Sequence, residues 1–236
     1  MALGATMVFE CRASATANNV NGGGYTSGGT DYSQQDAAVT DFSKTDGTSN
    51  ASTTFTSAAA TFTAQAVGNV LHLISGTNGT PGWYEIATYV SANEITLDRN
   101  CSTGAMTDGV FNVGGAMSLN SAVANQTDDD FFEIMLAGHK IWIENGSYTL
   151  GVTVSIAADG SETSPIVIEG YNATRGDAPT GSTRPTMVGG ANNWSWTGDY
   201  WDIFNLIITG TGTVNFNRSG HSSKTVNCKG INTSST

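Results

Sequence analysis

Short apolar segments recur through the last hundred residues of the chain, and they constrain its fold more than any other feature. Most hold a few strand-forming residues, and Gly, Asn, Ser or Asp separates each from the next. Two of them, at Asn205 and Asn227, place an Asn before a buried-type residue at the same point. The spacing of these asparagines is typical of solenoid repeats. The segments are KIWIE, YTLGVTVSI, SPIVIEGY, RPTMVGG, NWSWTG, YWDIFNLIITG, TVNFN and KTVNCKGIN.

The pattern predicts a parallel β-helix over residues 139–236. In such a solenoid each coil contributes two or three short strands, and each strand pairs with its counterpart one coil away. Ile, Val, Leu, Met and Trp then stack inside, and an Asn at a corner bonds along its own stack. Ile143 and Ile168 lie at a similar spacing, which fits the repeat. The open end of the solenoid needs a partner, a cap or more chain.

The composition agrees with an all-β fold. Only 12% of residues are charged, and polarity comes mainly from Gly, Ser, Thr and Asn, whereas good helix formers are scarce. Between residues 61 and 120, strand-like segments recur at short, regular intervals and predict a small antiparallel barrel or sandwich. Residues 1–60 are polar and Gly-rich, and we expect an extended N-terminal attachment arm.

One segment is predicted to be helical, NQTDDDFFEIMLAGHK (125–140). Thr127 and Asp130 have the spacing of a capping box, and the neighbouring acidic residues favour a helix N-terminus. The helix, placed at 121–138, would cover the first coil with its apolar face. The acidic triplet would also suit a metal site, but helix-start electrostatics explain it more simply, so no metal or cofactor is predicted.

Charge and sorting signals restrict the partners. The net charge is −11 with nine Lys and Arg, which disfavours binding to nucleic acid and to anionic membranes. Three separated cysteines, Cys11, Cys101 and Cys228, give no metal-binding or disulfide pattern. No signal peptide or membrane span is expected, so we expect synthesis in a cytoplasm, with Met1 or Met7 as the start.

Three stretches resemble, in their order, bacteriophage virion proteins that carry a pectate-lyase-like right-handed parallel β-helix, such as tail-spike, fibre and head-decoration proteins. They are NGGGYTSGGTDYSQQDAA, VGNVLHLISGTNGTPGWYEIATYVSANEITLDR, and IWIENGSYTLGVTVSIAADGSETSPIVIEGYNATRGDAP followed by RPTM and YWDIFNLIITG. The resemblance spans nearly the whole chain, but its motifs are structural rather than chemical. The sequence departs from the family by ending after about three or four coils.

The resemblance implies a homotrimeric, non-enzymatic protein of the virion surface, made in the host cytoplasm. Its N-terminal part would attach to other virion proteins, and its β-helix would project outward, where host surface polysaccharide is a possible contact. A polysaccharide-depolymerising tail spike is the alternative, and a secreted bacterial adhesin is a second alternative. The location on the particle, whether capsid, portal or tail, is left open.

Three tryptophans, Trp194, Trp196 and Trp201, are candidates for glycan or subunit contact. Alternation in WSW places Trp194 and Trp196 on one face of a strand. If that face points outward, the rings form a binding surface or an interface. If it points inward, they belong to the core. The sequence favours core or interface over an open sugar platform, because large aromatic residues are seldom left exposed.

Catalytic groups are sparse. Glycoside hydrolysis needs two carboxylates facing one sugar, and only Asp199 and Asp202 are close in sequence. The histidines are scattered, and SGHSS (219–223) places Ser beside His without an orienting acid. We therefore predict no catalytic residues. The solenoid carboxylates are Glu144, Glu162, Glu169, Asp177, Asp199 and Asp202, and the histidines are His72, His139 and His221.

The tripeptide Arg175-Gly176-Asp177 matches a motif that some adhesion proteins present to integrins. It follows SPIVIEGY and precedes RPTM, which predicts a loop between coils. Gly176 would allow a tight turn there, and Asp177 would bond to nearby amides. The sequence therefore favours a structural turn over an adhesive motif.

Overall fold

The computed structural model describes residues 8–13, 42–67, 70–114, 132, 135–149, 153–173, 175–190, 192, 194–210, 216–218 and 222–232. The regular elements bounded within these residues are β-strands, apart from two short 3-10 turns, η2 (Ala64–Ala66) and η3 (Gly181–Thr183). The chain forms two compact units. The first is described mainly between residues 42 and 114, and the second from Glu10 to Ala13 and from residue 132 onward.

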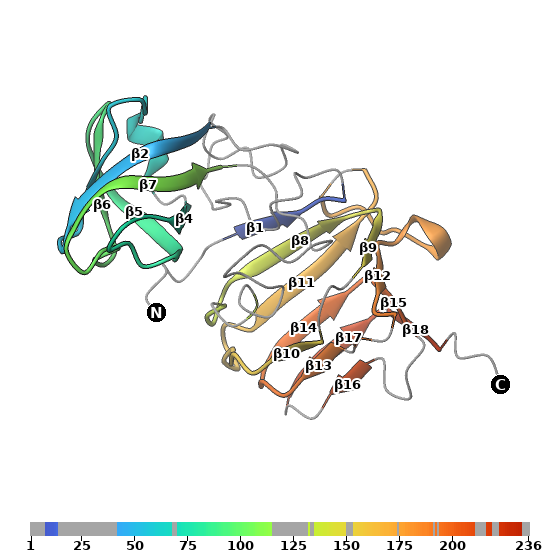
Figure 1. Ribbon diagram of the computed structural model, residues 1–236. Coiled ribbons are helices and arrows are strands. Elements are labelled where there is room, and N and C mark those ends of the chain that lie inside the picture. The colour runs from blue at the N-terminus through green and yellow to red at the C-terminus, as the bar shows by residue number, and fades with distance from the viewer. Residues whose placement is uncertain are drawn as a thin grey trace. The chain divides into compact units, whose positions relative to one another are not determined.

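The first unit is a closed barrel of six antiparallel strands in the order β2-β3-β6-β5-β4-β7 (Figure 1). Leu71 and Leu73 alternate with His72 along β4 and point into the barrel core. Phe55 packs edge to face on Phe111, with ring centroids 4.8 Å apart. The predicted small antiparallel barrel is confirmed. Its strands are β2 (Phe42–Asn50), β3 (Thr54–Thr56), β4 (Val70–Ser75), β5 (Gly82–Ser91), β6 (Glu94–Leu97) and β7 (Ala105–Val113).

The barrel begins earlier than predicted. Its strands β2 and β3 lie within residues 1–60, which were expected to form an attachment arm. Their sequence is nearly all small and polar, so it gave little sign of a core, yet Phe55 is fully buried. Most of the rest of the expected arm, residues 14–41, lies outside the described residues.

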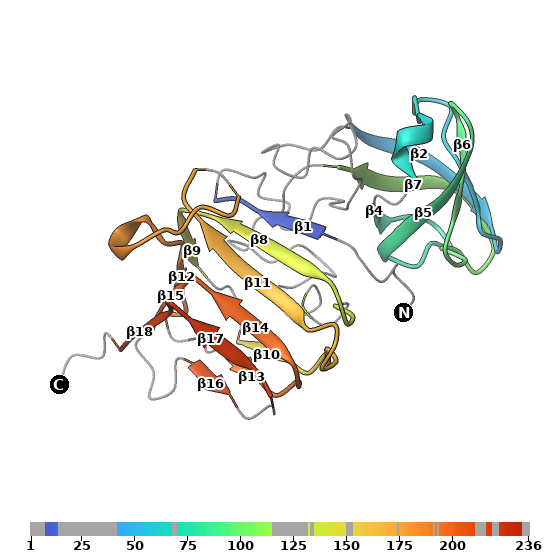
Figure 2. The same ribbon diagram turned by 180° about the vertical axis from the view of Figure 1, so that it is seen from behind.

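The second unit is built from three parallel sheets, which the chain visits in the same order in each coil (Figures 1 and 2). The sheets have the orders β1-β8-β11-β14-β17, β9-β12-β15-β18 and β10-β13-β16. From β8 onward, strands three elements apart are therefore neighbours, as the predicted solenoid requires. The strands are β1 (Val8–Cys11), β8 (Lys140–Glu144), β9 (Ser147–Thr149), β10 (Val154–Ile156), β11 (Ile166–Tyr171), β12 (Thr186–Val188), β13 (Trp194–Trp196), β14 (Trp201–Phe204), β15 (Ile207–Gly210), β16 (Phe216–Arg218), β17 (Lys224–Val226) and β18 (Lys229–Asn232).

Successive coils repeat along the sequence at the spacing that separates Asp202 from Lys224, its partner in the next coil. The same offset recurs in the other two sheets, between β15 and β18 and between β13 and β16. Earlier coils are longer because two connections are extended, 157–165 and 172–185. Inside, Ile141, Ile168 and Ile203 are in register and at most 1% exposed, so they form a buried column.

Corner residues repeat as well. Asn205 and Asn227 both adopt left-handed backbone, with φ of 60° and 53°. Asn tolerates this conformation better than most residues. Nδ2 of Asn227 donates to Oδ1 of Asn205 at 2.8 Å, and Asn205 in turn donates to the Gly170 carbonyl at 3.2 Å. The predicted bonding of corner asparagines along their own stack is confirmed.

The similar spacing of Ile143 and Ile168 does not mark a stacked pair. Ile168 is paired with Ile141, and Ile143 with Gly170, because the offset between the first two coils is longer than the spacing of Ile143 and Ile168. The extended connection 157–165 adds residues that a search for a constant repeat cannot anticipate.

The predicted helix at 121–138 lies largely outside the described residues, as do its capping residues Thr127 and Asp130. The described end of that segment does not continue a helix. Ala137 and Gly138 form a turn, with the His139 amide bonded to the Leu136 carbonyl at 3.0 Å, and Lys140 already begins β8.

Gly198 gives a direct test of the coil packing. A Cβ on this residue would lie 2.0 Å from the Ala158 carbonyl oxygen of the preceding coil, which is backbone and cannot rotate away. We expect Gly198→Ala to lower the free energy of unfolding by about 1–3 kcal/mol, measured by urea denaturation. Gly230→Ala is the control, because a Cβ there meets nothing within 4 Å. Equal stability of the two variants would contradict this packing.

Candidate functional site

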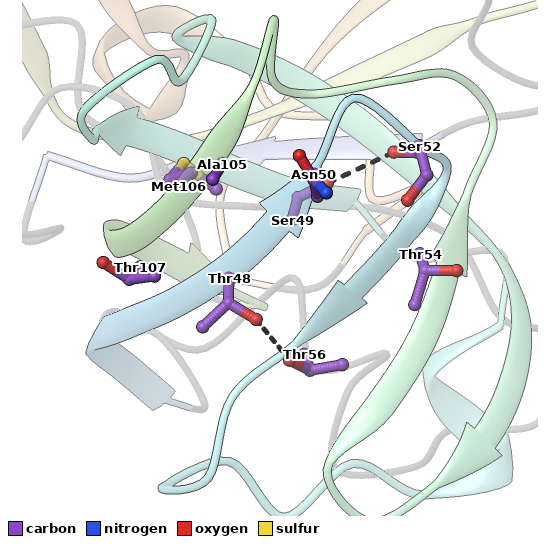
Figure 3. Close-up of a pocket in the computed structure, with 9 residues that line it drawn as sticks. All are labelled: Thr48, Ser49, Asn50, Ser52, Thr54, Thr56, Ala105, Met106 and Thr107. Atoms are coloured by element: carbon purple, nitrogen blue, oxygen red, sulfur yellow. Dashed lines mark hydrogen bonds between the residues drawn. The ribbon is translucent and has the colours of Figure 1, made fainter.

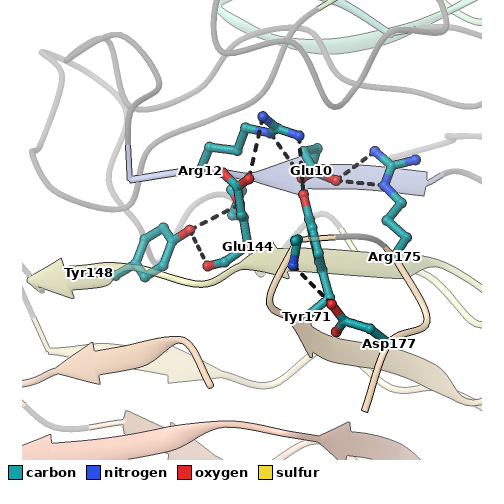
Figure 4. Close-up of polar contacts among 9 residues, drawn as sticks. Glu10, Arg12, Glu144, Tyr148, Tyr171, Arg175 and Asp177 are labelled. Carbon is teal, nitrogen blue, oxygen red and sulfur yellow. Dashed lines mark hydrogen bonds and ion pairs between the residues drawn. The ribbon is translucent and has the colours of Figure 1, made fainter. Parts of the chain in front are cut away.

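A buried carboxylate lies at the edge of the five-stranded sheet in the second unit. Glu10 of β1 is fully buried, and three side chains donate to it (Figure 4). Arg175 reaches Oε2 through Nε at 2.9 Å and Nη2 at 2.6 Å, and Arg12 reaches Oε1 at 3.3 Å. The Tyr171 hydroxyl donates to the same Oε1 atom. These bonds satisfy a charge that would otherwise be costly to bury.

Two kinds of effect act in opposite directions on the pKa of the Glu10 carboxyl. Burial raises the pKa of the Glu10 carboxyl above its ordinary value, while the charges of Arg175 and Arg12 and the bond from Tyr171 act to lower it. Burial is also the main cause of the raised pKa of Tyr171 and of Tyr148, so both phenols stay protonated at neutral pH. With its oxygens occupied and shielded from solvent, Glu10 is suited to holding chain segments together rather than to attacking a substrate.

The Arg175-Gly176-Asp177 tripeptide is part of this structure. Arg175 is bound to Glu10, and Asp177 accepts hydrogen bonds from the backbone amides of Asn172 and Ala173, each at 2.9 Å. Gly176 has a φ of 84°, which favours glycine. The predicted turn between coils is confirmed, because both charged side chains bond within the protein.

The tryptophan candidates do not form an exposed platform. Trp196 and Trp201 are 1% and 0% exposed, and the Trp201 indole nitrogen donates to the Ala158 carbonyl at 2.6 Å. Both rings therefore lie in the core, one of the placements that the sequence left open, and neither is available for glycan or subunit contact. Trp194 lies in β13, but its side chain is outside the described structure.

The outward aromatic residues lie instead on the five-stranded sheet. Trp142 of β8 and Phe204 of β14 are half-buried on its outer face. Lys140 Nζ lies 3.6 Å from the centroid of the Trp142 ring and 2.6 Å from Oε2 of Glu169. Lys224 approaches the Phe204 ring at 5.2 Å. We call the surface formed by Lys140, Trp142, Glu169, Phe204 and Lys224 the outer strip.

Sequence reasoning missed the outer strip because KIWIE reads simply as an apolar strand. The alternation of Ile141, Trp142 and Ile143 was the usable signal, since it places the tryptophan opposite two core isoleucines.

Three of the six solenoid carboxylates bond within the protein through their side chains, and a fourth residue, Asp199, is held through its backbone. Glu144 pairs with Arg12 at 3.6 Å, and Glu169 pairs with Lys140. Asp177 closes its own loop. The backbone of Asp199 is bonded on both sides, its amide to Asp159 Oδ1 at 2.8 Å and its carbonyl to the Gly160 amide at 2.9 Å.

The remaining two carboxylates, Glu162 and Asp202, share a pocket of about 270 Å³ at the corner before the five-stranded sheet. The sequence singled out Asp199 and Asp202 as the carboxylates close to each other, but the two that share a pocket are Glu162 and Asp202. Tyr200 also lines this corner pocket and has a φ of 56°, which is strained for an aromatic residue. Ser222, one repeat later, has a φ of 53°. The lining residues are Ser161, Glu162, Pro165, Tyr200, Asp202 and Ser222.

A second pocket, of about 330 Å³, opens in the barrel wall where β2 and β3 diverge (Figure 3). These strands pair at Thr48 and Thr56, whose hydroxyls are 2.5 Å apart. Threonine, serine and asparagine side chains line the pocket with Ala105 and Met106, and most of its surface is apolar; the lining holds no charged residue, so the pocket offers some hydrogen bonds but no acid or base. Its lining comprises Thr48, Ser49, Asn50, Ser52, Thr54, Thr56, Ala105, Met106 and Thr107.

The histidines are not brought together. His72 stacks on Trp83 with ring centroids 4.8 Å apart, and His139 Nδ1 accepts from the Leu136 amide at 3.2 Å. His221 lies outside the described residues. Across the described ranges, no group of three or more His, Cys, Asp or Glu side chains is arranged to hold a metal ion.

Within the described part of the chain, no helix has the length and apolar character needed to cross a membrane. Comparisons of the sequence and structure with protein-family models, with curated proteins and with solved structures found no match.

Proposed function

We propose that the protein is a non-enzymatic structural component of a bacteriophage virion surface. It would act as a homotrimeric spike, fibre or head-decoration protein, attached through its N-terminal part to other virion proteins. Its coils would form a right-handed β-helix, because connections between parallel strands are right-handed in nearly all proteins. The β-helix would project outward and could meet host surface polysaccharide.

The observation that carries this proposal is the register of the coils. Three parallel sheets with a regular repeat, a buried Ile column and stacked corner asparagines make a stiff rod from a weakly charged sequence. Such a rod suits a projecting element exposed to solvent. The resemblance in sequence to virion proteins then supplies the biological setting, since a fold alone does not specify a function.

The outer strip supports the trimeric assembly. Trp142 and Phe204 are half-buried on the outside of a sheet, where a subunit contact would cover them. Aromatic residues are frequent energetic centres of protein interfaces. Trp142 and Phe204 therefore replace Trp196 and Trp201, which point into the core, as candidates for subunit contact.

Light scattering after gel filtration tests the assembly. We expect a mass three times the 24.4 kDa of the chain, and resistance of the oligomer to SDS. Trp142→Ala should weaken association by about 2 kcal/mol or more. Tyr89→Ala is the control, because Tyr89 is an aromatic residue of the barrel that is 37% exposed. A stable monomer at high concentration would count against the proposed trimer.

A polysaccharide depolymerase is the second candidate function, and the corner pocket favours it. Glu162 and Asp202 come from neighbouring coils and line one cavity, as a general acid and its partner carboxylate would. Tyr200, held in strained backbone beside them, is a feature often associated with functional sites.

Release of reducing ends from host capsule or lipopolysaccharide distinguishes the two functions. If the pocket is catalytic, Asp202→Asn and Glu162→Gln should each reduce the rate by about 100-fold or more, whereas Glu94→Gln in the barrel should not. The non-enzymatic proposal predicts no release by the unmodified protein. Activity that persists in both pocket variants would exclude this pocket as the active site.

A further inference from the structure

The long connection between β11 and β12 is bonded to both ends of the coil stack. We call its described residues, 172–173 and 175–184, the strap. At one end Arg175 binds Glu10 on β1, the first strand of the five-stranded sheet. At the other end the Pro179 carbonyl accepts from Asn227 Nδ2 at 2.9 Å, in the fourth coil. The strap therefore links β1 directly to the fourth coil. Within the five-stranded sheet, these two segments are connected only through the strands that lie between them.

The two attachments differ in their chemistry. Arg184 anchors the far end by donating to the Asn227 carbonyl at 2.6 Å, and it is 9% exposed. This far attachment joins a guanidinium to a peptide carbonyl and contains no carboxylate. The near end depends on a carboxylate, which loses its charge when it takes up a proton. Only the Glu10 attachment can thus respond to acid.

We propose that the strap is an acid-released latch, whose Arg175 end detaches when Glu10 is protonated while its Asn227 end stays bound. Protonation removes the charge that holds Arg175, and this guanidinium, already 29% exposed, can then turn into solvent. Opening would expose the Arg175–Asp177 tip and loosen the contact between β1 and the second coil.

The groups around Glu10 couple its proton uptake to release of Arg175, because the charge and hydrogen bond of Arg175 lower the pKa of Glu10 and this lowering is lost when Arg175 detaches. Arg12 on β1, Tyr171 at the end of β11 and Arg175 on the strap contact it directly. Glu144 at the end of β8 adds a negative charge close by, through its pairing with Arg12. Burial outweighs the two arginines and raises the pKa of Glu10. The carboxyl therefore takes up its proton at a higher pH than an exposed glutamate does.

Tyr148 on β9 and Cys11 on β1 complete the surroundings, since the Tyr148 hydroxyl donates to the Cys11 carbonyl at 3.1 Å. Burial raises the pKa of the Tyr148 phenol, which therefore keeps its proton between neutral pH and mild acid. Asp177 on the strap is a further carboxylate, which accepts from the Asn172 and Ala173 amides, and a variant without Arg175 separates its effect from that of Glu10.

The strap also has backbone freedom where a latch needs it. Gly176 and Gly181 have φ of 84° and 54°, and a Cβ on either would meet nothing within 4 Å. These glycines stand on either side of Pro179, so the tip can move while the Asn227 attachment holds.

Limited trypsin digestion of the full chain at neutral pH reports opening, because trypsin cuts between Arg175 and Gly176 only when the tip is free. We expect Glu10→Gln to speed this cleavage at least about tenfold, through loss of a charge-assisted bond. Asp98→Asn is the matched control, because it removes a carboxylate paired with Arg99 in the barrel, a unit that does not include the strap. Equal acceleration in both variants would show general loosening and would overturn the latch.

Hydrogen exchange of the unmodified protein provides the second measurement, and it does not depend on a variant that folds. After correction for intrinsic exchange, amides of 172, 173 and 175–178 should exchange faster at about pH 5 than at neutral pH, whereas those around Arg184 should not. Arg175→Gln, altered at a partly exposed side chain, should exchange fast at both pH values. A tip equally protected at both pH values in the unmodified protein would contradict the proposal.

Discussion

Parallel pairing in register between successive coils is the constraint on which the second unit depends. A shift of one residue would turn the Ile141, Ile168 and Ile203 column outward and bring polar neighbours into the core. The register also sets the corners, because Asn227 meets Asn205 only when their coils are offset by one full repeat. Insertions are tolerated in the connections alone, and the two long ones form the strap and one wall of the corner pocket.

Much of this architecture could be predicted from the sequence. Strand segments separated by Gly and Asn indicated the all-β class and the barrel, and the Asn205–Asn227 spacing indicated the repeat and its bonded corner. The turn at Arg175–Asp177 was also predictable, because it follows a buried strand and contains Gly and Asp. In each case the prediction depends on residues that are close together in the sequence, so it can be made without knowing the fold.

The remaining features depend on contacts between residues distant in the chain. Glu10 and Arg175 are 165 positions apart in the sequence, and no local pattern marks β1 as a strand of the five-stranded sheet. The corner pocket joins Glu162 to Asp202 through an insertion of unpredictable length. The direction of Trp201 depended on register, which fixed it inside the core. The periodicity of apolar residues identifies strands, but it does not give the lengths of the loops that set how neighbouring strands align.

Disulfide formation between neighbouring coils tests the register most directly. Asp202 and Lys224 are partners in β14 and β17, so cysteines at both positions, with Cys228 replaced by Ser, should oxidise readily, since a disulfide needs Cα atoms about 4.4–6.8 Å apart. The pair Asp202→Cys with Val226→Cys, which is out of register, should stay reduced under the same mild oxidation. Rapid closure of the shifted pair, with the in-register pair unreacted, would contradict the stacked-coil architecture.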